Sequence, residues 1–161
     1  MPDCLPPDST LRELHADDDI DLMARWLFKL WGDYDPDETL ESCRSSLVDG
    51  LDPALKTPKT FVYLQGGKLA AWASIIDVDI SDRPDLGPWL ANLTVLPEFR
   101  GQGIARHLTR HVMTYAKDVT KTLYLYTDNL QATYQSMGWK TQHDITIGDK
   151  PVTLMTWDAG R

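Results

Sequence analysis

A short loop with two glycines is the stretch of this sequence best suited to chemistry. Its residues, Arg100-Gly101-Gln102-Gly103-Ile104-Ala105, follow an apolar, β-branched run (residues 90–95) and precede a segment of helical period. The first N–H groups of a helix have no intrahelical acceptor and that end is partly positive, so an anion placed there gains several donors. Glycines let the backbone approach the anion with positive φ, and Arg100 adds a permanent charge. The spacing predicts a phosphate-binding loop between a strand and a helix.

Two other kinds of nucleotide loop fit these residues poorly. A Walker loop ends in Gly-Lys-Ser/Thr, whereas this loop ends in Gly103-Ile104-Ala105. The dinucleotide fingerprint needs a third glycine at a different spacing. Farther along the predicted helix, His107 and His111 have the four-residue spacing of a metal-binding pair. Polar residues on an exposed helix face are the commoner interpretation, and we predict no metal site.

The loop resembles the acetyl-CoA pyrophosphate loop of the GCN5-related N-acetyltransferase (GNAT) family, whose pattern is Gln/Arg-x-x-Gly-x-Gly/Ala. Downstream, Tyr134 lies four residues before Gly138 and Trp139, which resembles the family's Tyr-x-x-x-Gly-Phe ending with Trp in place of Phe. The resemblance covers about residues 60–140. It implies an α/β (α+β) fold, with a mixed, mostly antiparallel sheet flanked by helices, and acetyl-CoA as co-substrate.

The resemblance also implies roles for single residues. Tyr134 would protonate the departing CoA thiolate, which is work for a general acid. The pantetheine arm would bind along the exposed edge of the central strand, where a backbone N–H would also meet the thioester oxygen. The family often has an Asn seven residues before this tyrosine; that position is Thr127 here, and Asn129 lies only five before it. The expected cofactor-binding residues are Leu93, Thr94, Val95, Arg100, Gly101, Gln102, Gly103, Ile104, Ala105 and Thr127.

The acceptor and the general base are less well defined by the sequence. An alkylammonium must lose a proton before it attacks, either to a water chain or to a carboxylate. By position the candidates are Asp77, Asp79 and Asp85. We expect acetyl transfer to a primary amine of a small molecule or peptide. The alternative is a non-catalytic acyl-CoA-binding sensor on the same fold, which has no need of Tyr134.

Composition and charge narrow the class of protein. The 161 residues suit a single domain, with residues 1–9 loose. The net charge of −8 argues against nucleic acid as a partner and suits a cationic amine. No apolar run approaches the ~18 residues of a membrane helix, and the N-terminus lacks the pattern of a signal peptide. Cys4 and Cys43 form no metal spacing. We therefore expect a cytoplasmic monomer or homodimer.

Turn residues and periodicity predict the elements that must position the loop. The cluster Asp17-Asp18-Asp19 supplies the N-cap of a first helix that runs to about Trp31. A second helix is predicted with Asp35 as N-cap, Pro36 at its first position and Glu38 as the returning partner of a capping box. Tryptophans 31, 72 and 89 are interpreted as core or substrate-wall residues. We expect strands at 10–14, 60–65, 68–77, 90–95, 122–127, 140–147 and 150–157, and helices at 19–31, 35–50, 104–119 and 129–137.

Overall fold

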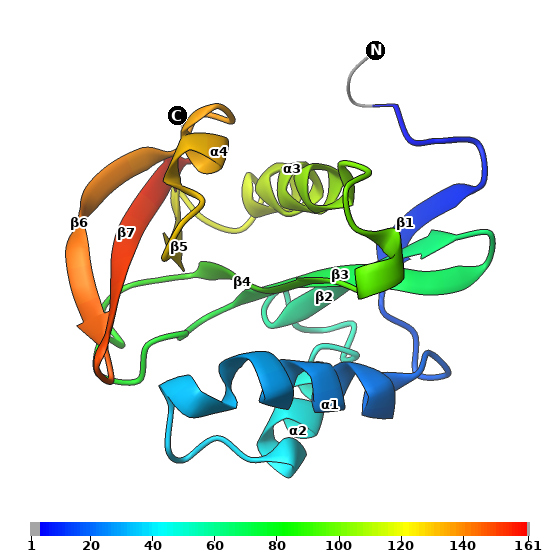
Figure 1. The fold of residues 1–161 in the computed structure, drawn as a ribbon, viewed down its shortest axis with the longest axis horizontal. Helices are drawn as coiled ribbons and strands as arrows, with labels where there is room; N and C mark the ends of the chain where they lie inside the picture. Colours follow the sequence, from blue (N-terminus) through cyan, green and yellow to red (C-terminus); the bar gives the residue numbers. More distant parts are fainter. Residues whose placement is uncertain (1–3, 161) are drawn as a thin grey trace.

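Seven strands form one sheet in the computed structural model, which describes residues 4–160 (Figure 1). The strand order is β1-β2-β3-β4-β5-β7-β6. All neighbours are antiparallel except β4 and β5, so the predicted mixed, mostly antiparallel sheet is confirmed. The strands are β1 (Ser9–Glu13), β2 (Lys59–Gln65), β3 (Lys68–Ile76), β4 (Trp89–Val95), β5 (Thr122–Thr127), β6 (Lys140–Ile147) and β7 (Lys150–Asp158).

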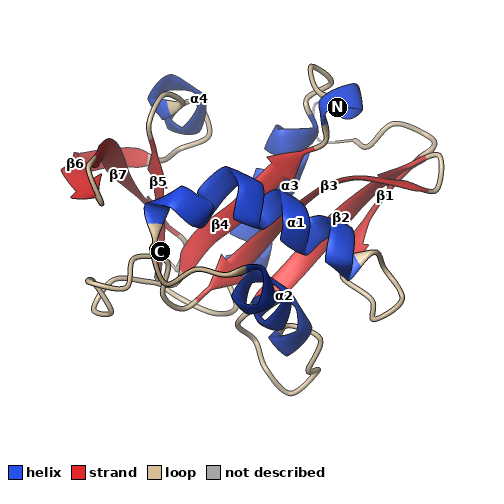
Figure 2. Ribbon diagram, turned by 60° about the horizontal axis from the view of Figure 1, so that its bottom comes forward, coloured by secondary structure: helices blue, strands red, loops and turns tan. Residues whose placement is uncertain are grey.

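Helices cover both faces of the sheet (Figures 1 and 2). One face carries α3, whose apolar residues Ile104, Leu108 and Val112 are buried against the strands, as the predicted stripe required. The other face carries α1 and α2, which pack around Met23, Leu27 and Trp72. The helices are α1 (Ile20–Trp31), α2 (Leu40–Asp49), α3 (Ile104–Ala116) and α4 (Gln131–Gln135), with short 3₁₀ helices η1 (Gly32–Tyr34) and η2 (Pro97–Phe99).

The two halves of the sheet separate at β4 and β5. These parallel strands share a single pair of Cα partners, Trp89 and Tyr124, and beyond it β5 turns away with β6 and β7 (Figure 1). We call the gap between the two strands the wedge. Because its strand edges are not paired to each other, the backbone of β4 is available to a ligand there.

The start of α2 differs from the sequence-based prediction. Thr39 is the N-cap and forms a capping box with Ser42, each side chain bonding the other residue's backbone N–H. Asp35 instead accepts a hydrogen bond from the N–H of Asp37 at 2.9 Å, which holds residues 35–37 in a turn. The prediction of Asp35 as N-cap was therefore wrong, because this local turn competes with a helical start.

The N-terminal segment is partly held in place. Residues 1–3 lie outside the described part of the chain. The carbonyl of Asp8 accepts a hydrogen bond from the N–H of Gly66 at 2.9 Å, and Ser9 belongs to β1. The expected looseness of residues 1–9 therefore does not hold for Asp8 and Ser9.

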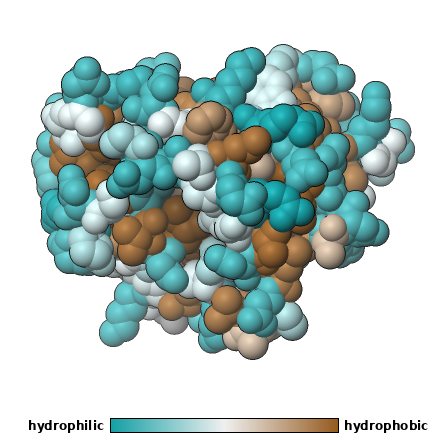
Figure 3. Space-filling view, turned by 90° about the horizontal axis from the view of Figure 1, so that it is seen from below, coloured by the Kyte–Doolittle hydropathy of each residue, from teal (hydrophilic) through white to brown (hydrophobic). Residues whose placement is uncertain are grey.

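The surface on the α1 and α2 side is mostly hydrophilic, with apolar patches between the polar residues (Figure 3). Phe28 and Leu30 of α1 and Leu40 of α2 contribute exposed apolar side chains. Within residues 4–160, no helix is both long and apolar enough to cross a membrane.

Candidate active site

The glycine loop has the geometry expected of an anion-binding loop. Gly101 has φ +79°, and Gly103, the N-cap of α3, has φ +80°. No side chain caps the first turn of α3. A Cβ added at either glycine would meet no heavy atom within 4 Å, so the space in front of the helix is open. The N–H groups there are free to bind a phosphate.

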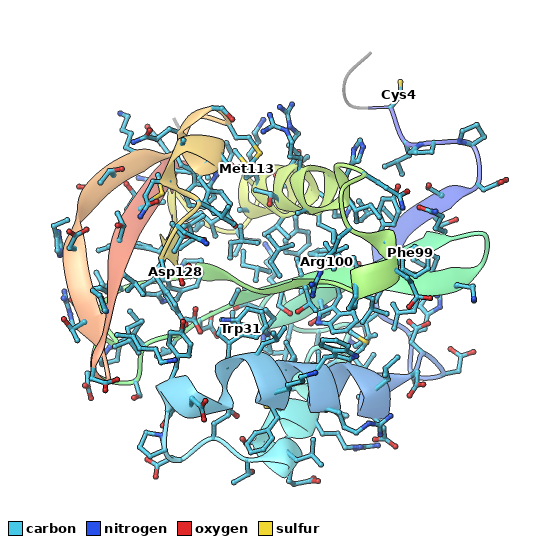
Figure 4. All side chains as sticks on the ribbon, in the orientation of Figure 1. Cys4, Trp31, Phe99, Arg100, Met113 and Asp128 are labelled. Atoms are coloured by element: carbon cyan, nitrogen blue, oxygen red, sulfur yellow. The ribbon has the colours of Figure 1, made fainter. Side chains whose placement is uncertain are left out.

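Arg100 fixes this loop to the end of β4. Its Nε donates to the carbonyl of Val95 at 2.9 Å, and its exposed side chain lies over β4 in Figure 4. Gln102 is exposed, Ala105 is half-buried and Ile104 belongs to the core beneath α3. Of the predicted loop residues, Ile104 can therefore offer a ligand its backbone but not its side chain.

The three residues predicted to bind the pantetheine arm direct their backbone groups to opposite edges of β4. The N–H of Leu96 donates to the carbonyl of Ala70 in β3, and Thr94 is paired with Trp72 of β3. Because backbone groups alternate along a strand, Leu93 and Val95 face the opposite edge, toward the wedge. The backbone of Thr94 faces β3. Its role in binding, like those of Leu93 and Val95, stays a prediction.

A β-bulge shapes this edge. Asn92 has φ +61°, a left-handed conformation that non-glycine residues seldom adopt, and the pairing of β3 with β4 shifts register beside it. Its side-chain amide donates to Ser74 Oγ at 3.2 Å, which holds the bulge in place. Sequence reasoning missed Asn92, although Asn is the residue type most tolerant of this conformation.

A cavity of about 250 Å³ opens at the wedge and extends toward α1. It is bounded by β4, by the end of β5, by the segment leading into α4, and by residues 31–38 after α1. Trp31 lies between α1 and β4 in Figure 4, and Asp128 lies at the β5 side. Its wall includes the aromatic and polar side chains of Trp31, Tyr34, Asp35, Glu38, Asp79, Tyr126, Asp128, Asn129 and Tyr134.

Tyr134 lines this cavity with 8% of its surface exposed. Its ring packs edge-on against Trp139, with 6.1 Å between centroids. Burial raises the pKa of Tyr134 to about 12. The phenol therefore keeps its proton throughout the neutral range, as a hydrogen-bond donor to a departing thiolate must.

Thr127 and Asn129 both line the cavity, but only one has its side chain engaged. The hydroxyl of Thr127 accepts a hydrogen bond from the N–H of Leu130 at 3.1 Å and so holds the turn that precedes α4. Asn129 is exposed at the rim. The predicted contact of Thr127 with the pantetheine arm stays a prediction, and Asn129 is a second polar side chain within the same cavity.

Of the three candidate bases, only Asp79 reaches the cavity. Asp77 is exposed and accepts a hydrogen bond from Thr57 at 2.5 Å. Asp85 is exposed and pairs with Arg83 at 2.9 Å. Burial, with a smaller contribution from the charge of Glu38, raises the pKa of Asp79 to about 7. A carboxylate with that pKa is suited to accept a proton near neutral pH.

Tyr126 and Glu38 are cavity residues that the sequence did not single out. Leu123 and Leu125 of β5 point into the core under α3, so the alternation of the strand sends Tyr124 and Tyr126 to the opposite face. Burial raises the pKa of Tyr126, and the charge of Asp79 adds to the shift. Glu38 was interpreted as part of a helix cap, which concealed its place beside Asp79.

The histidine pair of α3 contacts aromatic rings of β2, and only one of the three predicted tryptophans lies at the cavity. His107 stacks on Tyr63 and His111 meets Phe61 edge-on. Trp72 and Trp89 are fully buried core residues, whereas Trp31 lines the cavity. Within residues 4–160, no three His, Cys, Asp or Glu side chains gather closely enough to hold a metal ion.

Comparison with known proteins agrees with this geometry. The family model described as acetyltransferase (GNAT) family matches residues 17–139. The chain belongs to the GNAT acetyltransferase family. The match includes β4, the glycine loop, α3 and Tyr134, which are the parts from which the resemblance was drawn. No curated protein sequence matches the chain.

Solved structures of several acetyltransferases share the fold at low sequence identity. An N-acetyltransferase from Staphylococcus aureus Mu50 superposes with a TM-score of 0.72 at 16% identity, over 94% of this chain and 98% of that one. The yncA protein of Salmonella typhimurium, solved with acetyl-CoA, gives 0.71 at 14%, over 95% of each chain. An aminoglycoside 6'-N-acetyltransferase complexed with coenzyme A gives 0.70 at 16%, over 94% and 98%.

Proposed function

We propose that this GNAT protein is an acetyl-CoA-dependent N-acetyltransferase that acts on a primary amine. One observation carries the proposal: a buried phenol, Tyr134, and a half-buried carboxylate of raised pKa, Asp79, line the same cavity at the open edge of β4. A proton donor for the leaving group and a proton acceptor for the nucleophile are the two groups that aminolysis of a thioester requires. A sensor that only binds acyl-CoA needs neither.

The residues around the wedge fit acetyl-CoA as the acyl donor. The open N-terminus of α3, with Arg100 beside it, would hold the pyrophosphate. The backbone groups of Leu93 and Val95 would hydrogen-bond the pantetheine arm. When bound, acetyl-CoA supplies an acetyl group activated as a thioester. Two neighbours of the same fold were solved with acetyl-CoA or coenzyme A, which supports this assignment of the donor.

In the proposed reaction Asp79 accepts the proton that the acceptor ammonium releases. The amine nitrogen then forms a bond to the acetyl carbon, and the bond from that carbon to sulfur breaks. Tyr134 donates its hydrogen to the departing sulfur, which leaves as the thiol; the nitrogen loses its second proton to solvent as the amide forms, and the phenolate takes one proton back from solvent. Since burial also raises the basicity of a thiolate in the same cavity, a donor with a pKa of about 12 is better matched to it than it would be in water.

The proposal is tested by incubating the protein with acetyl-CoA and a panel of primary amines. Free thiol is measured with a thiol-reactive chromogenic reagent, and the acetylated product is detected by mass spectrometry. We expect thiol release that depends on the amine and that falls at least 100-fold in Asp79→Asn. Asp85→Asn, which alters an exposed carboxylate outside the cavity, is the matched control and should keep the wild-type rate. Tight acetyl-CoA binding without thiol release for any amine would overturn the proposal in favour of the sensor.

A further inference from the structure

The charges around the cavity exceed what a single ammonium group requires. Besides Asp79, the carboxylates of Asp35, Glu38 and Asp128 line it. Within residues 4–160 no Lys, Arg or His side chain lines this cavity, and the ion pairs found there involve other carboxylates. Lys150 is nearby, but its Nζ lies over the ring of Tyr34 at 4.6 Å. The cavity therefore carries negative charge that the protein itself does not pair.

Hydrogen bonds from the protein satisfy only part of these carboxylates. Asp35 Oδ1 accepts from the N–H of Asp37, and Glu38 Oε1 accepts from Ser42 Oγ and from Cys43 Sγ. In the described part of the chain, Asp79 is half-buried, and its carboxyl group has neither a hydrogen bond nor an ion pair. Ionising a carboxyl group that is largely withdrawn from water and has no partner is costly, and a cationic ligand would reduce that cost.

A second cavity, of about 220 Å³, continues from the first toward α2. The two cavities share Trp31, Asp35, Glu38, Asp79 and Asn92 in their walls, so the three carboxylates stand where the cavities meet. The far wall adds the small or apolar side chains of Leu27, Cys43, Ser46, Ile76, Val78 and Ser81. An acceptor that reaches Asp79 from this side has room for a chain of several atoms.

Aromatic rings complete the wall in a way that favours cations. Trp31, Tyr34 and Tyr126 line the first cavity, and the rings of Tyr34 and Tyr126 are 6.3 Å apart. The face of an aromatic ring attracts an ammonium group. Since Lys150 lies over Tyr34, the rings of Trp31 and Tyr126 are the ones that would contact an alkylammonium beside the carboxylates.

We infer that the acceptor is a dicationic aliphatic amine, a linear diamine or polyamine, whose reacting nitrogen lies at Asp79 and whose second ammonium lies at Asp35 and Glu38. The inference rests on the proposed function, because it names the substrate class of that same site. A single ammonium would leave three of the four carboxylates without a counter-charge, whereas a dication places one positive charge at Asp79 and a second at Asp35 and Glu38.

The first test compares amines of equal length that differ only in their far end. The panel is butylamine, 4-aminobutan-1-ol, 1,4-diaminobutane and 4-aminobutanoate, each assayed with saturating acetyl-CoA. We expect kcat/KM for the diamine to exceed that for butylamine at least tenfold, and 4-aminobutanoate to react at least tenfold more slowly than butylamine. The preference for the diamine should shrink as NaCl is raised. Equal rates for the diamine and butylamine would overturn the inference.

The second test removes, one at a time, the two carboxylates that we assign to the second ammonium group. In Asp35→Asn and Glu38→Gln, the ratio of kcat/KM for diamine to butylamine should fall at least fivefold, mainly through KM. Asp35→Asn keeps the turn intact, since the amide oxygen of Asn still accepts a hydrogen bond from the N–H of Asp37. The test therefore remains valid if Glu38→Gln fails to fold. Glu41→Gln, on the exposed first turn of α2 and outside both cavities, is the control and should keep the ratio. An unchanged ratio in both cavity variants would refute the placement.

The outcomes separate this inference from the proposed function. If no amine releases thiol, the proposed function fails, and the inference with it. If amines react but the diamine has no advantage, only the inference fails. Acetylation that requires an acidic or neutral acceptor would likewise overturn the inference while leaving N-acetyl transfer intact.

Discussion

Replacing Asp79 by Asn tests the structural argument in two independent ways, through stability and through catalysis. The pKa of Asp79 rises from its ordinary value of 3.8 to about 7 because the carboxyl group is buried, with Glu38 adding repulsion. Each pH unit of such a rise corresponds to about 1.36 kcal/mol. The full effect of ionising Asp79 on the free energy of unfolding is therefore about 4 kcal/mol.

The sign follows from which state of the chain holds the proton. Below pH 4 the carboxyl group is protonated in both states, and it affects stability little. Between pH 4 and pH 7 the unfolded chain loses the proton while the folded chain keeps it, so the wild type loses about 1.4 kcal/mol per pH unit from this group. Above pH 7 the folded chain carries the buried charge and the loss is complete. Asp79→Asn has no such dependence.

The assay is urea unfolding of both proteins at pH 5, 6, 7 and 8. The free energy of unfolding of the variant, minus that of the wild type, should increase by about 2 to 3 kcal/mol from pH 5 to pH 8. A constant offset reflects how well the amide is accommodated and does not bear on the argument. Asp82→Asn, at an exposed position outside the cavities, should give a flat difference. A flat difference for Asp79→Asn as well would refute the burial of an ionisable group at this position.

The activity of the wild type should rise with pH over the range in which its stability falls. The wild-type rate at low amine concentration should fall below about pH 7, as Asp79 becomes protonated and can no longer accept a proton. In Asp79→Asn the rate should be ~10²–10⁴-fold lower, the usual range for a positioned base. A variant that gains stability at pH 8 and loses turnover would show that this carboxylate is kept for chemistry and not for the fold.

Three further predictions address the loop, the acid and the helix start. Gly103→Glu should weaken acetyl-CoA binding at least ~100-fold, measured by calorimetry, because it places a carboxylate at the N-terminus of α3. Gly103→Ala has the same strained φ without the charge and should bind acetyl-CoA more tightly than Gly103→Glu does. Equal affinities of the two variants would show that the phosphate binds elsewhere. Tyr134→Phe should lower kcat by ~10²–10⁴ with little change in KM for acetyl-CoA. Tyr124→Phe, outside the cavity, should leave kcat unchanged. Because the pKa of Tyr134 is about 12, ionisation of this group should not lower the wild-type rate below about pH 11. Thr39→Ala should cost about 1 kcal/mol in urea unfolding and Thr39→Ser should restore it; an unchanged midpoint for Thr39→Ala would contradict the observed cap.

The order of elements and the glycine loop could be predicted because their signals are local. Gly101 and Gly103 mark the loop, and the apolar stripe from Ile104 fixes the buried face of α3. The start of α2 was misplaced because Asp35 and Thr39 both suit a cap, and only their hydrogen bonds distinguish them. Local signals are therefore sufficient where a single pattern is present, and insufficient where two compete within five residues.

The composition of the cavity could not be predicted, because it depends on elements that are distant in sequence. Asp77, Asp79 and Asp85 are equivalent by sequence, and only the path of the chain after β3 brings Asp79 into the cavity. Glu38 reaches the same place from the segment before α2, and Tyr126 from β5. Nothing in the local sequence of any of them indicates the others, so the charge around Asp79 becomes visible only in the folded chain.

The single Cα pair between β4 and β5 has a consequence for how the protein unfolds. On one side of it β1 to β4 form a continuous ladder, and on the other β5, β6 and β7 form a second one. The ladders are joined mainly by side chains, among them Trp89 against Tyr124 and Tyr126, with 5.5 and 6.2 Å between ring centroids. Because one backbone pair joins the ladders, we expect the C-terminal ladder to open as a cooperative unit of its own, at the cost of its contacts with the shared core under α3. A pantetheine arm bonded along β4 within the wedge would bridge the two units, and the co-substrate would then couple two folding units into one.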